Sequence, residues 1–318
     1  MRALVAGGGG FIGSHLCERL IDEGHTVICA DNFLTGRRSN VAHPLASPRF
    51  SLIELDFITS APEVEPERIY HLASPASPPG YTRFPLETMR VNSEGTRNLL
   101  ELAARTGSRF LYASTSEVYG DPLEHPQREE YRGNVSSTGP RSMYDEAKRF
   151  GEAITMAYRN TRLVDVRIAR IFNTYGPQSD PDDGRLVPNF VVQALTGRPI
   201  TVYGDGKQTR SLCFVSDLVD GLMRLMESEA ASGEVVNLGN PDEHTVLEYA
   251  EMTRRLACSN SEIAFADYAV GDDPQRRCPD ITRARELLGW EPVIGLEEGL
   301  SKTIEYFRSE IALQECTA

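Results

Sequence analysis

The sequence lacks the features of several protein classes. None of its apolar runs approaches the ~20 residues that a membrane-spanning helix needs, and no signal peptide precedes the first apolar stretch. We therefore expect a cytoplasmic protein with no membrane partner. Lys and Arg are outnumbered by Asp and Glu, 33 to 46, which gives a formal net charge of −13. An acidic chain argues against general nucleic-acid binding, because that binding depends on neutralising phosphates.

Cysteine is sparse as well. The six cysteines are scattered among 318 residues and form no C-x-x-C pair, and the histidines, among them His125, show no ligand spacing. We therefore expect reduced thiols and no metal site. What the sequence does have is 40% hydrophobic and 25% charged residues, a balance typical of a globular protein with a sizeable core.

Strand-like apolar runs alternate with helical patterns through the first two thirds of the chain. The expected strands span residues 2–6, 26–30, 50–55, 68–73, 109–114 and 163–169. The expected helices between them span residues 11–23, 85–106 and 142–160. Several strands are apolar throughout, as a parallel sheet covered on both faces requires. The pattern predicts an α/β fold with a Rossmann-like, doubly wound parallel sheet.

After about residue 173 the loops become rich in Gly, Pro and Asp and the helices become shorter. We expect these helices near residues 187–197, 216–228, 245–257 and 296–309, with a strand at 235–238 that returns to the main sheet. The prediction is a Rossmann domain over residues 1–172 with a return segment at about 212–240. A smaller, interleaved lobe is predicted for residues 173–211 and 241–318.

A glycine-rich turn at residues 7–13 joins the first expected strand to the first expected helix. It fits G-x-G-x-x-G from Gly8, and such a turn brings backbone without side chains against a pyrophosphate at a helix amino terminus. Asp31 ends the second strand, where a carboxylate accepts hydrogen bonds from a ribose diol and repels a 2′-phosphate. The pattern predicts NAD as cofactor, with NADP left open by Arg37 and Arg38. The expected contacts from the turn are Gly7, Gly10, Phe11, Ile12 and Gly13.

Tyr144 and Lys148 are spaced i, i+4 in a helical pattern and so share one helix face. An ammonium near a phenol stabilises the phenolate, which lowers the tyrosine pKa toward the range of a general base. Thr115 and Glu117 follow a central strand, at the sheet edge where open α/β folds bind ligands. We expect Thr115 to hydrogen-bond a substrate hydroxyl and Glu117 to act as a second acid or base. The alternatives are a solvated helix face and a surface carboxylate.

Together these motifs resemble the extended short-chain dehydrogenase/reductase superfamily that modifies nucleotide sugars. More selective segments are similar to the UDP-glucuronic acid decarboxylase family, and the similarity runs from about residue 2 to 308. These segments are residues 71–79 (HLASPASPP), 114–122 (STSEVYGDP), 170–177 (RIFNTYGP), 183–185 (DGR), 201–204 (TVYG), 208–210 (QTR) and 272–277 (DDPQRR).

The resemblance implies decarboxylation of UDP-glucuronate to UDP-xylose through a UDP-4-keto intermediate, with NAD recycled in each turnover. Tyr144 and Lys148 match the pair that removes the C4′ hydroxyl proton, and Thr115 matches the residue that orients this hydroxyl. Loss of carbon dioxide then needs a positioned carboxylate and a donor to the enolate. The C5′ proton comes from Arg277, acting through water, or from Glu117.

The resemblance also implies binding residues. For NAD these are Asp31, Asn32, Asp56, Leu72, Asn92, Tyr144 and Lys148, in addition to the glycine turn. For the nucleotide sugar they are Asn173, Arg185, Tyr203, Arg210 and Arg276. Guanidinium groups match phosphate oxygens, so Arg210 and Arg276 suit the diphosphate, and Tyr203 suits the uracil ring. Ordinary surface charge is the alternative for both arginines.

Several other functions stay open at this point. A UDP-glucuronic acid 4-epimerase makes the same keto intermediate but keeps the carboxylate; Glu117 and Arg276–Arg277 favour decarboxylation. Release of the 4-keto pentose and formation of UDP-apiose share the first steps. A catalytically silent NAD-binding protein would not need the proton relay of Thr115, Tyr144 and Lys148. The helical patterns 85–106 and 142–160 resemble the pair that forms a dimer seam in the superfamily, so we expect a homodimer.

Overall fold

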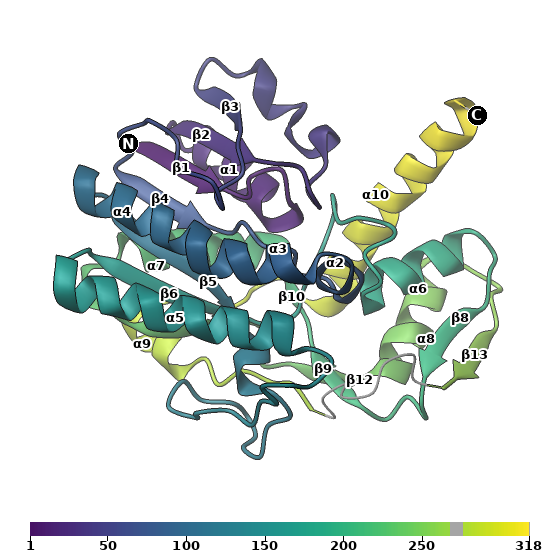
Figure 1. Cartoon of the computed structure of the whole chain (residues 1–318). Helices are drawn as coiled ribbons and strands as arrows, with labels where there is room; N and C mark the ends of the chain where they lie inside the picture. The colour runs from purple at the N-terminus through teal and green to yellow at the C-terminus, as the bar shows by residue number, and fades with distance from the viewer. Residues whose placement is uncertain (268–275, 318) are drawn as a thin grey trace.

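A seven-stranded, wholly parallel sheet forms the centre of the protein in a computed structural model that describes residues 1–267 and 276–317 (Figure 1). Its strand order is β11-β6-β5-β4-β1-β2-β3. The strands are β1 (Arg2–Ala6), β2 (Thr26–Asp31), β3 (Phe50–Glu54), β4 (Arg68–His71), β5 (Arg109–Thr115), β6 (Val166–Ile171) and β11 (Val235–Leu238). The predicted return of residues 235–238 to this sheet is confirmed, because β11 pairs in parallel with β6.

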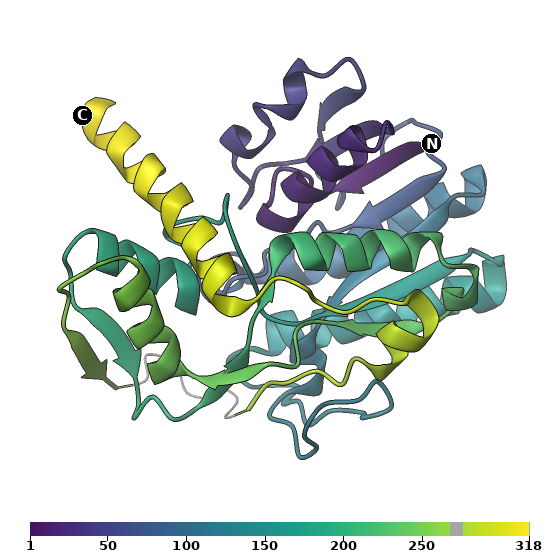
Figure 2. The ribbon, with the colours of Figure 1, turned by 180° about the vertical axis from the view of Figure 1, so that it is seen from behind.

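Helices cover both faces of the sheet (Figures 1 and 2). One face carries α4 (Thr96–Thr106) and α5 (Ser142–Arg162), and the other carries α1 (Phe11–Asp22) and α7 (Val215–Glu227). Since water reaches neither face, a central strand such as β1 has no exposed side chain from Ala3 to Ala6. The predicted doubly wound α/β fold is confirmed.

Two predicted boundaries need correction. The expected strand at 163–169 begins at Val166, because Leu163 adopts a left-handed conformation (φ 57°) that ends α5. The expected helix at 85–106 is divided into α3 (Pro85–Arg90), a π-helical turn (Val91–Gly95) and α4.

One helix lies in a segment for which the sequence patterns predicted none. It is α2 (Pro78–Arg83), which begins with two prolines, whose fixed φ suits the first helical turn. The hydroxyl of Ser77 caps it by accepting a hydrogen bond from the Gly80 amide, 3.2 Å away. A proline-rich segment therefore folds into a helix beside the sheet edge.

The smaller part of the molecule contains short strands that apolar patterning did not predict, since each spans only two to four residues. They pair as β7 (Thr174–Tyr175) with β10 (Cys213–Phe214), β8 (Ile200–Tyr203) with β13 (Ile263–Ala266), and β9 (Thr209–Ser211) with β12 (Glu243–Thr245). The helices here are α6 (Leu186–Leu195), α8 (Val246–Leu256), α9 (Thr282–Leu288) and α10 (Leu296–Thr317). The last of these extends beyond the expected 296–309 and projects from the body (Figure 2). In the described chain, no helix is long and apolar enough to span a lipid bilayer.

Candidate active site

The turn between β1 and α1 has no room for side chains. Gly7 has φ +84°, which disfavours any residue with a Cβ. A Cβ on Gly13 would lie 2.1 Å from the carbonyl oxygen of Gly7, so the first turn of α1 packs directly on the loop. Close backbone packing at a helix amino terminus is the arrangement that accommodates a pyrophosphate. The residues present therefore fit a dinucleotide.

An open cleft lies beside this turn. Six of the predicted cofactor contacts line it: Gly7, Gly10, Asp31, Asn32, Asp56 and Leu72. Phe11, Ile12 and Gly13 lie in the first turn of α1 and do not line the cleft. Asn92 is fully buried and does not line it either, but its side-chain amide donates to the hydroxyl of Ser74, a lining residue, at 2.8 Å. Asn92 thus holds Ser74, and with it the wall of the cleft, from the buried side.

Asp31 binds the glycine turn as well as facing the cleft. Its two carboxylate oxygens accept from the amides of Gly9 (2.9 Å) and Phe33 (2.7 Å). Burial raises the pKa of Asp31, and these two amide donors act against that rise. Arg37 and Arg38 do not line the cleft; Arg38 pairs with Glu54 at 2.5 Å. A carboxylate, rather than either of these arginines, therefore lines the cleft where the 2′-phosphate of NADP would bind.

Tyr144 and Lys148 are both buried on α5, beneath the carboxyl end of β5. The Lys148 ammonium donates to the carbonyl of Ala113 at 2.8 Å and lies 5.9 Å from the centre of the Tyr144 ring. Burial lowers the pKa of Lys148 to about 7. Burial also raises the pKa of Tyr144 well above its ordinary value, although its hydrogen bond with Thr115 opposes the rise. The prediction that Tyr144 has a lowered pKa is therefore wrong for the protein alone, because desolvation outweighs the hydrogen bond with Thr115 and the charge of Arg185.

Glu117 lies just past β5 between two arginines. Its carboxylate pairs with Arg141 and lies 3.1 Å from Arg277, which is only 2% exposed and also donates to the carbonyl of Ser116. Burial alone would raise the pKa of Glu117, but Arg277, Arg141, Arg210 and Arg185 outweigh it and lower that pKa. Glu117 is therefore held as an anion, which makes it a poor proton donor.

Sequence reasoning missed two residues at this edge. Arg141 stands three positions before Tyr144, so helical spacing beside a known site was the available signal. Tyr81 on α2 stacks on Tyr144, with ring centroids 4.9 Å apart and planes 13° apart. The sequence offered little indication of Tyr81, because it follows a proline-rich segment in which no helix was predicted.

The expected substrate-binding residues are distributed along the smaller part of the molecule. Arg185 and Arg210 are close enough to Glu117 to lower its pKa, and Arg185 also pairs with Asp183 at 3.0 Å. Tyr203 ends β8 with 40% of its surface exposed, and Arg276 is exposed. The carbonyl of Asn173, between β6 and β7, accepts from the amide of Cys213 at 2.9 Å. The predicted segment 272–277 is described only from Arg276 onward.

Comparisons with known proteins agree with this geometry. Residues 3–239 match the model of the NAD dependent epimerase/dehydratase family. The chain is 53% identical over 313 residues to UDP-glucuronic acid decarboxylase 1 of Xenopus tropicalis, covering 98% of this chain and 73% of that protein. It is 54% identical over 311 residues to UDP-glucuronic acid decarboxylase 2 of Arabidopsis thaliana, covering 98% and 69%.

Among solved structures, it resembles the UDP-glucuronic acid 4-epimerase of Bacillus cereus in complex with UDP-glucuronic acid and NAD. The TM-score is 0.87 at 27% identity, and the match covers 98% of this chain and 100% of the epimerase. The fold shared with the epimerase is thus accompanied by much higher sequence identity to the decarboxylases. The chain belongs to the NAD dependent epimerase/dehydratase family and, within it, to the family of UDP-glucuronic acid decarboxylases.

Proposed function

We propose that this protein is an NAD-dependent UDP-glucuronic acid decarboxylase, which converts UDP-glucuronate into UDP-xylose through a UDP-4-keto intermediate. The observation that carries the proposal is the contact of Glu117 with Arg141 and Arg277 at the sheet edge that also holds Thr115 and Tyr144. Identity of 53–54% to decarboxylases, against 27% to the 4-epimerase, supports the same conclusion.

The glycine turn would hold the pyrophosphate of NAD, and Asp31 would accept hydrogen bonds from its adenosine ribose. Bound NAD would supply the acceptor for the C4′ hydride and the means of returning it within the turnover, and its positive ring would favour the phenolate form of Tyr144. The chain's own groups that would hold it are the amides of the turn, together with Asp31, Asn32, Asp56 and Leu72, which also line the cleft.

Tyr144 begins the reaction by accepting the proton of the C4′ hydroxyl. Thr115 already shares a hydrogen bond with Tyr144, so it holds the phenol oxygen toward the end of β5. Lys148, whose pKa of about 7 is close to neutrality, exchanges a proton readily and supports the phenolate when it is charged. The product of this step is a ketone at C4′, which lies β to the sugar carboxylate.

Decarboxylation needs the carboxylate held and the ketone oxygen stabilised. The C5′–C6′ bond breaks, carbon dioxide leaves, and the electron pair moves into the C4′ carbonyl to give an enolate. The protonated Tyr144 and Thr115 are placed to donate hydrogen bonds to this oxygen. The arginines around Glu117 favour an anionic sugar at this position, because they give the pocket a local positive charge within an acidic protein.

Protonation of C5′ turns the enolate into the UDP-4-keto pentose, and UDP-xylose forms only when C4′ regains its hydride and Tyr144 returns the proton to the C4′ oxygen. Guanidinium is a poor acid, and Glu117 is held as an anion, so neither is suited to give the proton directly. A water molecule hydrogen-bonded between Glu117 and Arg277 supplies it and regains a proton from solvent. Glu117 and Arg277 therefore act by orienting the proton source on one face of the enolate.

The proposal also includes the binding and assembly predicted from the sequence. Arg210 and Arg276 bind the diphosphate, Tyr203 lies against uracil, and Asn173 and Arg185 contact the sugar nucleotide. The Rossmann part comprises residues 1–172 and about 212–240, and the remaining segments form the substrate lobe. A homodimer is supported by exposed Leu86 and Met89 on α3 and exposed Phe150 on the adjacent α5. A cytoplasmic location stays a prediction.

An end-point assay tests the proposal. The protein is incubated with UDP-glucuronate and NAD, and the products are identified by mass spectrometry and proton NMR. Loss of carbon dioxide with the original C4′ configuration restored is the expected result. An unchanged mass with inverted C4′ would contradict decarboxylation and indicate the epimerase, whereas a UDP-4-keto pentose as final product would indicate release of the intermediate.

A further inference from the structure

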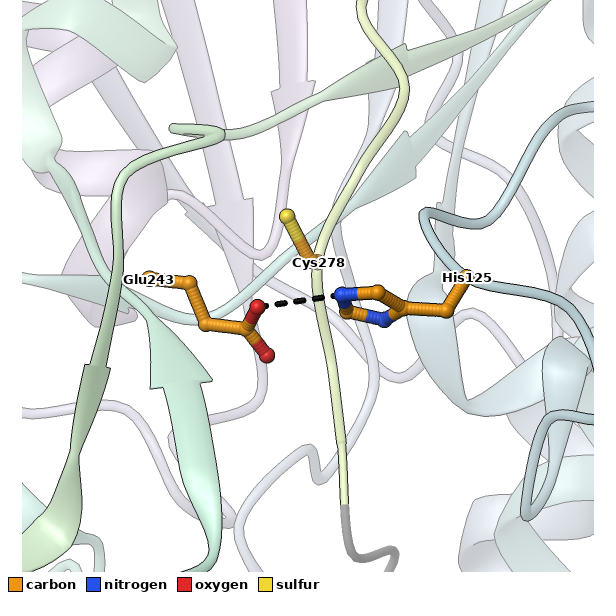
Figure 3. Close-up of side chains that lie close together, drawn as sticks. All are labelled: His125, Glu243 and Cys278. Carbon is orange, nitrogen blue, oxygen red and sulfur yellow. Dashed lines mark hydrogen bonds and ion pairs between the residues drawn. The ribbon is translucent and has the colours of Figure 1, made fainter.

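Three residues that are far apart in the sequence meet where the loop after β5 contacts the smaller part of the molecule, and none of them lines the cofactor cleft. His125 lies on the loop after β5, Glu243 on β12, and Cys278 on the segment that leads to α9 (Figure 3). The imidazole Nε2 of His125 lies 3.0 Å from the carboxylate of Glu243, and Cys278 lies between the two. All three ligand atoms are within 4.8 Å of one another.

These residue types form a recognised donor set. Imidazole nitrogen, thiolate sulfur and carboxylate oxygen together suit Zn²⁺, which takes three protein ligands and leaves a fourth position for water. Zn²⁺ bonds of about 2.0–2.3 Å put tetrahedral ligand atoms about 3.5 Å apart, so a shift of about 1 Å in the side chains closes the site. We propose that His125, Glu243 and Cys278 form a binding site for a single zinc-class divalent cation.

The backbone around the cluster is already fixed. Gln127, two residues after His125 and fully buried, exchanges two hydrogen bonds with Cys278: its amide donates to the Cys278 carbonyl, and its side-chain oxygen accepts from the Cys278 amide, both at 2.9 Å. Glu243 is placed by the antiparallel pairing of β12 with β9, and the hydroxyl of Thr209 donates to its other oxygen. Such outer hydrogen bonds orient metal ligands.

The site is accessible to an ion from solvent, although its three side chains are mostly shielded from water. The side chains of His125 and Glu243 are 25% and 18% exposed, whereas Cys278 is 6% exposed. On binding, the ion displaces the thiol proton of Cys278 to solvent, replaces the hydrogen bond between His125 and Glu243 while the imidazole keeps a proton on Nδ1, and forms bonds to sulfur, nitrogen and oxygen. Because Arg277 directly precedes Cys278, the ion would also tie the segment that carries Arg277 to β12.

The competing explanation is an ordinary ion pair between His125 and Glu243, beside a Cys278 thiol that only donates a hydrogen bond to the carbonyl of Pro241, 3.4 Å away. Zn²⁺ titration of chelator-stripped protein, followed by competition with a chromogenic zinc indicator, separates the two. We expect one equivalent to bind, with affinity at least tenfold lower in Cys278→Ser and in His125→Gln. Cys258→Ser, at an exposed cysteine outside the cluster, is the matched control and should bind as the unchanged chain does.

Co²⁺ gives a second readout that needs no turnover, so it is independent of the proposed enzymatic function. A thiolate-to-metal charge-transfer band should appear in the unchanged chain and in Cys258→Ser, and vanish in Cys278→Ser. Zn²⁺ should also raise the melting temperature of the unchanged chain, because it binds the folded state. Absence of the band, or Zn²⁺ affinity that is the same in His125→Gln and the unchanged chain, would overturn the proposal. Melting curves without metal verify that each variant is folded.

Discussion

The guanidinium of Arg277 lies 3.1 Å from the carboxylate of Glu117, although the two residues are 160 positions apart. Glu117 follows a central strand of the sheet, whereas Arg277 comes from the segment between β13 and α9. The contact therefore joins the two parts of the molecule at the edge where Tyr144 lies. The Arg277 side chain is 2% exposed and that of Glu117 is 16% exposed, so water has little access to the pair.

Glu117→Gln should lower kcat by about 10²-fold, because a neutral amide neither holds the two arginines by charge nor orients the water that protonates C5′. KM for UDP-glucuronate should change much less, since the diphosphate contacts are retained. Glu146→Gln is the matched control: Glu146 lies on the surface of α5 and pairs with Arg149 at 3.6 Å. Steady-state kinetics of the two variants measure the effect. An unchanged kcat in Glu117→Gln would show that Glu117 takes no part in the chemical steps.

Tyr144→Phe should lower turnover by about 10²–10⁴-fold, because phenylalanine keeps the ring that stacks on Tyr81 but has no oxygen to accept the C4′ proton. Binding of UDP should be unaffected, as measured by calorimetry. Tyr158→Phe provides the comparison, since Tyr158 lies on the same helix and hydrogen-bonds to Glu101 on the surface. Its activity should stay within about twofold of the unchanged enzyme. Comparable losses in both variants would point to a structural effect on α5.

Lys148→Met should change how stability depends on pH. Lysine has a pKa of about 10.4 in an unfolded chain, against about 7 for Lys148 in the folded protein. Below pH 7 the lysine is protonated in both the folded and the unfolded chain, and the buried ammonium lowers the free energy of unfolding by its full amount. Between pH 7 and about 10.4 the unfolded state binds more protons, so the lysine's cost falls as pH rises.

Between pH 6 and about 10, the unchanged chain should therefore gain a few kcal/mol of unfolding free energy relative to Lys148→Met. Denaturant titrations at several pH values measure it. Lys302→Met, which removes an exposed lysine paired with Glu298, should show no comparable pH-dependent shift. A difference for Lys148→Met that stays constant with pH would show that Lys148 has an ordinary pKa.

Gly13→Ala should destabilise the protein by about 1–3 kcal/mol and weaken NAD binding at least tenfold, because the added Cβ would meet the Gly7 carbonyl at 2.1 Å. Thermal unfolding and calorimetric NAD titration measure the two effects. Gly295→Ala is the control, since a Cβ there meets nothing within 4 Å. Normal NAD affinity in Gly13→Ala would mean that the turn is not the pyrophosphate site.

The sequence predicted the sheet well, because a strand covered on both faces must be apolar throughout. It also predicted the glycine turn, where the close packing of Gly13 on the Gly7 carbonyl leaves no room for a Cβ. It did not predict strands such as β7 and β10, since two residues show no period. Arg141 and Tyr81 were missed for a related reason: each meets the site through a tertiary contact. The pKa of Tyr144 was predicted in the wrong direction because spacing shows a neighbouring charge but not the loss of solvation.

In the proposed reaction the carboxyl carbon leaves while C4′ returns to its original configuration. UDP-glucuronate labelled with carbon-13 at C6′ tests this most directly, when carbon-13 and proton NMR follow the reaction in real time. We expect labelled carbon dioxide and bicarbonate to appear in equal molar amount with UDP-xylose, and neither product to appear with Tyr144→Phe. Label that remains in the sugar, as UDP-galacturonate, would contradict it.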